Sequence, residues 1–242
     1  KVKFITIPFE KIVGQILERT HHGVRGVILK RMMVRVASKV ASRLNAEALI
    51  TGEAVGQVSS QTLTNLNHID NVSECIVLRP LAMEDKQDIV DKAWEIGTAG
   101  FAESMPEYCG VISDHPNVCP SSSFVEEEEA KMDANLVEDA IERASHLDIK
   151  AIPENTSKLE VEVETVSELN FGDVILDVRS PDDALKAPLK DDNHTVIELP
   201  FYKVASEFDK LDEIKTYALY CDQGVMSLMQ ARELKEKGHH NV

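Results

Sequence analysis

The sequence lacks any long apolar run without charge. No stretch of about 18 uncharged apolar residues occurs, and the start, Lys1 to Pro8, has the pattern of a strand and not of a signal peptide. We therefore expect a chain that neither spans a membrane nor is secreted. Pro and Gly are not in excess, and 43% apolar with 28% charged residues predicts ordinary globular folding over 242 residues.

Cysteine is scarce as well. The four cysteines are irregularly spaced and form no CxxC pair, which argues against a disulfide scaffold and against a zinc site. Two common phosphate-binding motifs, GxxxxGK[ST] and GxGxxG, are also absent. These absences predict a cytoplasmic protein with reduced cysteines, no metal site and no standard dinucleotide or Walker loop.

Charge is abundant but unevenly distributed. The net charge is −16, and residues 121–170 hold 14 acidic and only 4 basic residues. Between Arg19 and Arg43 there are seven basic residues and no acidic one. Four of these form a stripe at i, i+4 spacing, here called the basic stripe: Arg31, Arg35, Lys39 and Arg43. The stripe predicts either a solvated helix face, the commoner outcome, or a surface for phosphates, with the adjoining Lys30 as the better ligand candidate.

Strand and helix patterns alternate along the chain. Strands are predicted at 2–7, 48–51, 75–78, 160–165, 174–178, 197–200 and 216–220, and helices at 11–19, 27–44, 86–96, 125–146, 204–211 and 226–237. This alternation predicts an α/β protein with a doubly wound parallel sheet followed by a smaller α/β unit. We expect a first domain over 1–120, an acidic helical linker over 121–150 and a second domain over 151–242.

Cys221 follows the apolar run Tyr217 to Tyr220 and precedes a predicted helix. Ligand sites of parallel sheets lie at the carboxyl ends of strands, and main-chain N–H groups of a strand–loop–helix turn converge there. With the helix dipole they stabilise a thiolate or a persulfide, while Gly224 allows the backbone to approach the sulfur. A lone cysteine is more often an inert core residue, but this setting favours a functional thiol.

The segment from about residue 150 to 242 resembles the rhodanese family. The resemblance rests on the Cys221 loop and on Asp177-Val178-Arg179-Ser180 after an apolar strand. It implies that Cys221 carries sulfur as a persulfide and that Asp177 and Arg179 form a buried structural pair. Many rhodanese loops contain a basic residue, whereas Gln223 leaves this loop without one, so a protein sulfur donor fits better than thiosulfate.

Three further motifs extend the resemblance over essentially the whole chain. Gly26 to Met33, the Gly52 to Thr62 loop and Met105 to Ser113 together look like the bacterial 4-thiouridine tRNA sulfurtransferase family, which also serves thiamine synthesis. The resemblance implies that residues 1–120 are part of a PP-loop ATP pyrophosphatase domain of the adenine-nucleotide α-hydrolase-like fold. That family's SGGxDS loop and N-terminal RNA-binding domain would precede Lys1, and the closing rhodanese strand would follow Val242.

This resemblance implies a sulfur relay from a cysteine desulfurase to an ATP-activated uridine in tRNA, and to the sulfur carrier protein for thiamine thiazole synthesis. Its site residues carry over by position. Lys30, Gly52 and Gln61 would bind ATP, with Mg²⁺ in the intact enzyme, and Lys86 would support adenylation. Cys109 would be a second catalytic cysteine that closes a disulfide with Cys221. The sequence leaves a monomer and a homodimer open.

Two other functions remain open from the sequence. A stand-alone rhodanese that acts on small molecules predicts thiosulfate-to-cyanide activity that does not depend on Cys109. A non-catalytic docking module for a desulfurase predicts that neither cysteine matters. Labelled sulfur that reaches Cys221 would favour the tRNA sulfurtransferase.

Overall fold

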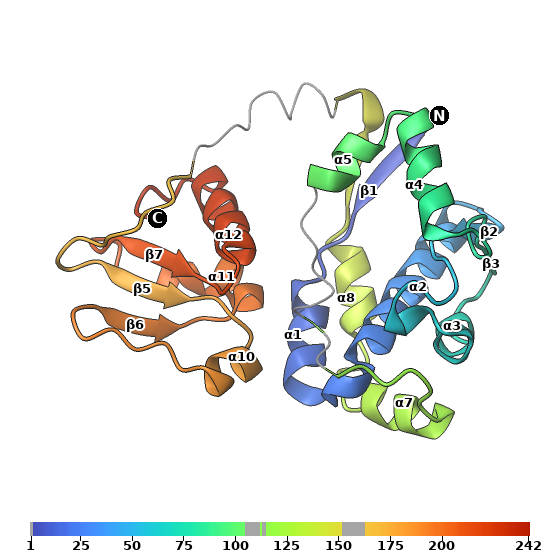
Figure 1. Cartoon of the computed structure of the whole chain (residues 1–242), viewed down its shortest axis with the longest axis horizontal. Helices are drawn as coiled ribbons and strands as arrows, with labels where there is room; N and C mark the ends of the chain where they lie inside the picture. The colour runs from blue at the N-terminus through green and yellow to red at the C-terminus, as the bar shows by residue number, and fades with distance from the viewer. Residues whose placement is uncertain (1, 105–111, 113–114, 152–162) are drawn as a thin grey trace. The chain divides into compact units, whose positions relative to one another are not determined.

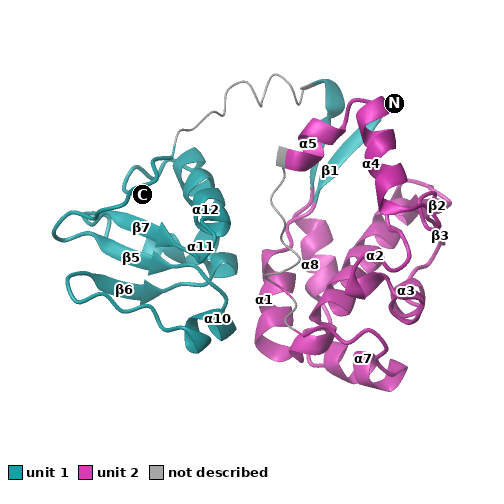
Figure 2. Cartoon of the chain, viewed as in Figure 1, with its two compact units in different colours: residues 1–6, 145–242 teal, residues 7–144 magenta. Residues whose placement is uncertain are grey.

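A computed structural model describes residues 2–104, 112, 115–151 and 163–242 (Figure 1). The chain divides into two compact units, which Figure 2 colours separately. Unit 2 consists of residues 7–144, and unit 1 consists of residues 1–6 together with 145–242. None of the helices in the described part of the chain has the length and hydropathy that a membrane span requires.

Unit 2 is mainly helical and has a short parallel sheet at one edge (Figure 1). Its elements are α1 (Glu10–Arg19), η1 (His22–Val24), α2 (Arg25–Arg43), β2 (Ala48–Ile50), η2 (Ser59–Gln61), α3 (Leu63–Asp70), β3 (Ile76–Leu78), α4 (Lys86–Glu95), α5 (Ala99–Ser104), α7 (Ser122–Glu129) and α8 (Leu136–Glu142), where η denotes a 3₁₀ helix. Two of these helices begin at hydroxyl caps, since Thr62 accepts from the amide of Asn65 and Ser121 accepts from the amide of Phe124.

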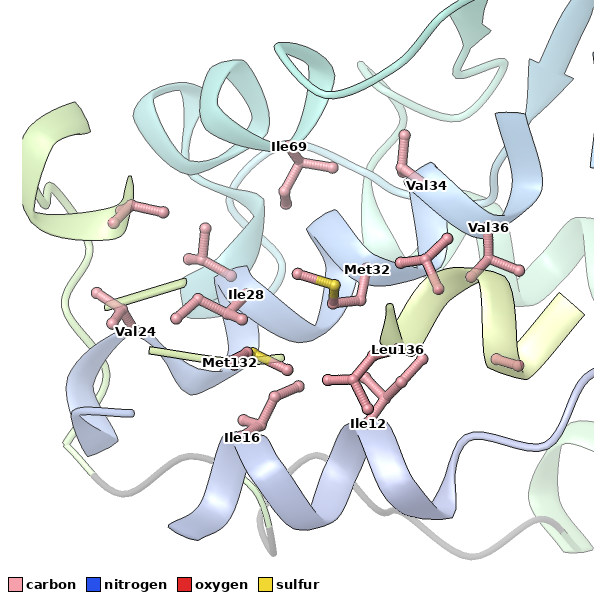
Figure 3. Close-up of a cluster of buried hydrophobic side chains, with 14 of the residues drawn as sticks. Ile12, Ile16, Val24, Ile28, Met32, Val34, Val36, Ile69, Met132 and Leu136 are labelled. Carbon is pink, nitrogen blue, oxygen red and sulfur yellow. The ribbon is translucent and has the colours of Figure 1, made fainter. Parts of the chain in front are cut away.

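Helix α2 lies at the centre of the unit 2 core. Ile28, Met32 and Val36 recur every four residues, so they share one face, and all three are buried. The side chains that meet this face come from α1, α8 and the loop before α8 (Figure 3): Ile12, Ile16, Met132 and Leu136. Each large apolar side chain buried in this way stabilises the fold by about 1.5–3 kcal/mol.

Strands β2 and β3 are parallel neighbours joined by α3. Ala48 pairs with Ile76 and Ile50 pairs with Leu78, and the pairing continues when the amide of Thr51 donates to the carbonyl of Leu78 (3.0 Å). Because the strands are parallel, the residues that follow Ile50 and those that follow Leu78 lie at the same edge of the sheet. This edge carries the charged residues of unit 2 described below.

Unit 1 contains two sheets. Its elements are β1 (Lys3–Thr6), β4 (Ser145–Asp148), η3 (Ile149–Ala151), β5 (Val174–Asp177), α10 (Pro181–Lys186), β6 (Thr195–Glu198), α11 (Phe201–Glu207), η4 (Phe208–Lys210), β7 (Tyr217–Tyr220) and α12 (Val225–Glu236). Strands β1 and β4 pair antiparallel, with Lys3 opposite Asp148. The other sheet is fully parallel, with the strand order β6-β5-β7.

The central strand of the parallel sheet, β5, is buried along its whole length. Val174 and Leu176 pack in a core with Val204 and Phe208 of the α11–η4 segment and Leu234 of α12. Parallel strands joined by crossover helices are expected to be apolar on both faces, and β5 follows that pattern. The sheet therefore holds the end of β7, and with it Cys221, against a packed core.

Most of the predicted elements are confirmed, but α3, α5, α10 and β4 were not predicted, and α11 begins at Phe201 and not at residue 204. The single helix expected over 125–146 is wrong, because α7 ends at Glu129 and α8 begins only at Leu136. Both helices bury apolar residues in the unit 2 core, so the stretch expected to be an acidic linker packs within unit 2 up to residue 144. Strand β6 begins two residues earlier than predicted, at Thr195. The strand predicted at 160–165 lies mostly outside the described residues.

Candidate functional site

Cys221 lies directly after β7, in a loop that ends where α12 begins. Gly224 stands at the N-cap of α12 with φ +74°, a left-handed conformation that glycine adopts without steric penalty. The amide of Gly224 donates to the carbonyl of Cys221 (3.3 Å) and closes the turn. The chain thus passes from strand to helix within four residues, as the sequence predicts.

The sulfur of Cys221 is half-buried and contacts one residue of α12 through two groups. The main-chain amide of Ser227 donates to Sγ at 3.3 Å, and Ser227 Oγ lies 3.4 Å from Sγ. Ser227 Oγ also donates to the carbonyl of Gly224 at 3.0 Å. The first turn of α12, at the positive end of the helix dipole, therefore supplies one main-chain donor to the sulfur, while the thiol itself donates to Ser227 Oγ; the amide and the dipole suit an anionic sulfur species.

A buried arginine anchors the residue next to Cys221. Arg179 donates from Nε and Nη2 to both carboxylate oxygens of Asp177 (2.9 and 2.6 Å), and its Nη1 lies 3.2 Å from Oδ1 of Asp222. The hydrogen bonds that Arg179 donates to Asp177 raise the pKa of Arg179, so the guanidinium stays charged. The Tyr220 ring lies against it, 5.1 Å from Cζ to the ring centroid, and burial followed by the Asp222 charge raises the pKa of Tyr220. The expected buried pair of Asp177 and Arg179 is thus present.

A second cluster lies in unit 2 at the carboxyl ends of β2 and β3. Glu53 accepts from Lys30 Nζ (2.7 Å) through Oε1 and from Arg79 Nε (2.9 Å) through Oε2. Arg79 is also bidentate to Asp70, at 2.9 and 2.6 Å. Burial alone would raise the pKa of Glu53, but the hydrogen bonds and charges of Lys30 and Arg79 outweigh it and lower that pKa. We call Lys30, Glu53, Asp70 and Arg79 the charged cluster.

The loop that follows β2 carries the other two predicted ATP ligands. A Cβ added to Gly52 would meet no atom within 4 Å, so the described fold leaves open space there. The same loop turns at Gly56, whose amide donates to the carbonyl of Gln61 (2.9 Å) and whose φ is +78°. Within the described ranges, the buried side-chain oxygen of Gln61 has no hydrogen-bond partner. Gly52 is thus the sequence neighbour of Glu53 in the charged cluster. The loop folds Gln61 back towards Gly56.

Lys86 and Cys109 are the remaining predicted site residues. Lys86 is exposed at the first position of α4, whose N-cap is Asp85. The chain just before α4 is tied to the Gly52 loop, because the amide of Val55 donates to the carbonyl of Ala82 (2.9 Å). Cys109 lies outside the described residues. The structure therefore brings Lys30 and the Gly52 loop together and places Lys86 a few residues beyond a main-chain contact to that loop.

The basic stripe departs from the predicted solvated helix face at Arg31, whose side chain is 5% exposed, whereas the side chains of the other three residues remain 37–57% exposed. Arg31 Nε and Arg35 Nη2 both donate to Glu129 of α7, at 2.5 Å each. Lys39 and Arg43 both lie on Glu138 of α8. The stripe packs against the acidic helices of the same unit, so its cations are neutralised within the fold.

Comparisons with known proteins identify the family. The family model described as "Thiamine biosynthesis protein (ThiI)" matches residues 1–134. The chain belongs to the ThiI family. Relatives named tRNA sulfurtransferase from Tolumonas auensis and Haemophilus influenzae are each 53% identical, and one from Yersinia pestis is 52% identical, over all 242 residues of this chain and 50% of each relative. This ThiI family chain thus spans about half the length of the curated relatives it matches.

A solved structure supports the same assignment. The chain is similar to the crystal structure of a 4-thiouridine synthetase–RNA complex with bound ATP, at 30% identity and a TM-score of 0.55. The match covers 60% of this chain and 39% of that chain. The likeness agrees with the predicted α/β class. Among the described residues, the parallel sheet of unit 2 has only the two strands β2 and β3, and not the doubly wound sheet that the sequence predicts.

Sequence reasoning missed four residues that the structure places in these sites. Glu53 follows Gly52 just after β2, and Arg79 follows Leu78 at the end of β3. Because the carboxyl ends of neighbouring parallel strands are where ligand sites lie, the predicted strands could have identified both residues. Asp70, the last residue of α3, pairs with Arg79, and no local pattern marks it. Ser227 follows Cys221 by six residues in the first turn of α12, a spacing that the predicted loop already contained.

Proposed function

We propose that this chain is the sulfur-carrying and ATP-using part of a tRNA thiolation enzyme. In this function, sulfur from a cysteine desulfurase is carried on Cys221 as a persulfide and passed to an ATP-activated uridine in tRNA, forming 4-thiouridine. The observation that carries the proposal is the position of Cys221 Sγ at a parallel-strand end, in contact with the first turn of α12. Membership of the ThiI family and relatives named tRNA sulfurtransferase support it.

The sulfur-loading step requires no external oxidant. The Cys221 thiolate attacks the outer sulfur of a donor persulfide, R–S–SH, and the bond between the two donor sulfurs breaks. The products are Cys221–S–SH and the donor thiolate R–S⁻, which takes up the proton released by the Cys221 thiol. The amide of Ser227 lies 3.3 Å from Sγ, where it stabilises the attacking anion.

The loop chemistry favours a protein donor over thiosulfate. Asp222 adjoins Cys221 and is 57% exposed in its side chain, and Gln223 is neutral, so the loop offers no cation of its own to a small dianion. A persulfide on a desulfurase delivers its sulfur without the double negative charge of thiosulfate. This arrangement favours the relay over a stand-alone rhodanese that acts on small molecules.

The residues of unit 2 fit an ATP molecule. Lys30 is a cation for phosphate, Gly52 leaves room for a ligand, and the unpaired buried oxygen of Gln61 can accept from an adenine amino group. ATP, when bound together with Mg²⁺, supplies the adenylyl group that activates the uridine. Lys86 would contribute positive charge from the start of α4. The likeness to a 4-thiouridine synthetase solved with RNA and bound ATP supports this role.

The later steps of the proposal rest on the motif around Cys109. The persulfide of Cys221 would displace the activating group and form Cys221–S–S–uridine. The Cys109 thiol would then attack Cys221 Sγ, release thiolated uridine and leave a disulfide between the two cysteines, which a dithiol must reduce with two electrons. In thiamine synthesis the acceptor would be the sulfur carrier protein, in line with the description of the matching family.

Radiolabelled sulfur tests the carrier assignment. A cysteine desulfurase supplied with ³⁵S-cysteine should label the parent chain and fail to label Cys221→Ser, as seen on a non-reducing gel. Cys75→Ser and Cys119→Ser are matched controls and should be labelled like the parent, since both are free cysteines outside this loop. Undiminished labelling of Cys221→Ser would show that another residue carries the sulfur.

A further inference from the structure

Ser227 contacts the sulfur of Cys221 with its side chain as well as with its main chain. The residue is only 9% exposed, although a serine in the first turn of a helix is commonly solvated. Its amide and its hydroxyl lie 3.3 and 3.4 Å from the sulfur. The amide contact belongs to the backbone and would survive any substitution except proline, so the hydroxyl is the part of this contact that depends on the side chain.

The hydroxyl has one hydrogen and two acceptors within reach. Ser227 Oγ lies 3.0 Å from the carbonyl oxygen of Gly224 and 3.4 Å from Cys221 Sγ. While the sulfur is a thiol, S–H can donate to Oγ and the hydroxyl hydrogen can point to Gly224. Once the sulfur is an anion, it has no hydrogen to donate and becomes the stronger acceptor, because hydrogen bonds to charged groups are stronger than those between neutral groups.

We propose that Ser227 is a catalytic residue of the sulfur-loading step whose hydroxyl turns from the Gly224 carbonyl to the sulfur of Cys221 when that sulfur is ionised. This role rests on the proposed function of Cys221 as a sulfur carrier. The rotation moves only one hydrogen atom, so the loop keeps its conformation. The sulfur anion thus gains a side-chain donor in addition to the amide, although the loop holds no basic side chain.

The proton and the electrons balance across this step. Before transfer, the thiol proton lies between Sγ and Ser227 Oγ; ionisation of the thiol releases it to water, and the departing donor thiolate R–S⁻ takes up a proton from water to leave as R–SH. The new bond joins Sγ to the transferred sulfur, and the donor sulfur–sulfur bond breaks. Ser227 neither gains nor loses a proton, because its own hydrogen only changes acceptor.

The test compares two serines that differ in their access to sulfur. Ser227→Ala removes the hydroxyl and keeps the amide contact. Ser206→Ala is the matched control, because Ser206 Oγ also donates to the carbonyl three residues earlier, that of Lys203 (3.1 Å), in another helix of unit 1. The measurements are the rate of ³⁵S loading from a desulfurase, the rate of Cys221 alkylation by iodoacetamide at one pH, and the unfolding midpoint.

Ser227→Ala should load and alkylate about tenfold more slowly than the parent, as expected for the loss of one hydrogen bond to a charged group. Ser206→Ala should match the parent, and Ser227→Thr, which keeps the hydroxyl, should restore most of the rate. A Ser227→Ala chain as fast as the parent overturns the inference. If Ser227→Ala is unstable, the threonine variant decides: a folded Ser227→Thr that is slow refutes a role of the hydroxyl, and a fast one supports it. A parent chain that takes up no label would instead contradict the proposed function itself.

Discussion

The Cys221 loop and the charged cluster are both built at the carboxyl ends of parallel strands, but they are assembled differently. In the Cys221 loop, the polar groups that contact the sulfur come, in the part of the chain that the structure describes, from within six residues of it. In the charged cluster, Glu53 bridges Lys30 and Arg79, which come from a helix and from a second strand end. The sulfur site is therefore a property of local sequence, whereas the cluster exists only after unit 2 has folded.

The two regions also differ in how their charges are satisfied. The charged cluster holds two cations and two carboxylates that already neutralise one another, so a ligand there must compete with Glu53 and Asp70 for Lys30 and Arg79. Among the described residues, the polar groups that the sulfur of Cys221 contacts are an amide and a hydroxyl. The charged cluster is thus held together by ion pairs, whereas the sulfur of Cys221 is surrounded by neutral hydrogen-bonding groups.

The largest expected effect concerns the support of the Cys221 loop. Arg179→Met should lower the free energy of unfolding of unit 1 by about 3–5 kcal/mol, because it leaves the Asp177 carboxylate buried without its partner. Urea unfolding followed by circular dichroism measures the change. Lys210→Met is the control, since its pair with Glu207 is exposed and should contribute at most about 1 kcal/mol. Equal effects of the two substitutions would contradict the buried anchor.

The charged cluster should respond less strongly, and in a pH-dependent way. Glu53→Gln should cost about 2 kcal/mol at neutral pH, because hydrogen bonds from two cations lose their charged acceptor. The folded-state pKa of Glu53 lies below its ordinary value of 4.5, so its contribution is complete above that pH and is lost as the pH falls through the lowered pKa. The difference in unfolding free energy between parent and variant should therefore shrink below pH 4.5.

Unfolding curves at several pH values measure that difference. Glu84→Gln, whose partner Lys92 is half exposed, is the control and should differ little from the parent at any pH. A Glu53→Gln effect that stays constant from neutral to acidic pH would argue that the carboxylate charge is not what holds the cluster together.

Substitutions of two glycines in the loop after β2 should separate an effect on stability from an effect on ATP binding. Gly56→Ala should destabilise unit 2 by about 1–2 kcal/mol, because φ is +78° there and a Cβ is strained in that conformation. Gly52→Ala should leave stability unchanged or raise it by up to about 1 kcal/mol, since nothing lies within 4 Å of the added Cβ. Titration calorimetry should show about tenfold weaker ATP binding for Gly52→Ala. Unchanged ATP affinity would place the nucleotide away from Gly52.

The smallest expected effect is a gain of activity. Gln223→Arg adds a cation to the Cys221 loop and should raise thiosulfate-to-cyanide sulfur transfer a few-fold above a low parent level, because the substrate is a dianion. Gln223→Met is the uncharged control. High activity in the parent would favour the stand-alone rhodanese and weaken the contrast between the two regions.

Much of unit 1 could be predicted from sequence because its signals are local. The apolar runs that become β5 and β7, and the turn at Gly224, each lie within a few residues, so the strand–cysteine–helix order followed directly. Helix α2 was equally predictable from its four-residue period, although it begins two residues earlier than expected, at Arg25.

Apart from the local contact of Ser227 with Cys221, the interactions that sequence reasoning missed join residues that lie apart in the sequence. Nothing near Arg31 indicates that its partner is Glu129, and nothing near Glu129 indicates a buried arginine. An acidic run usually predicts a solvated helix, and the helix dipole supports that interpretation. The break between α7 and α8 was missed for the same reason, because it is set by packing on α2 and not by a proline or glycine in the sequence.

The pairing of the basic stripe with α7 and α8 has a consequence for synthesis of the chain. Arg31 and Glu129 are separated by 98 positions, so at about 5–20 residues per second a ribosome makes the arginines some 5–20 seconds before their partners. During that interval the nascent helix presents unpaired positive charge. A chain cut at residue 120 would remain in that state permanently, with Arg31, Arg35, Lys39 and Arg43 deprived of their carboxylates and the α2 core missing the side chains of α8.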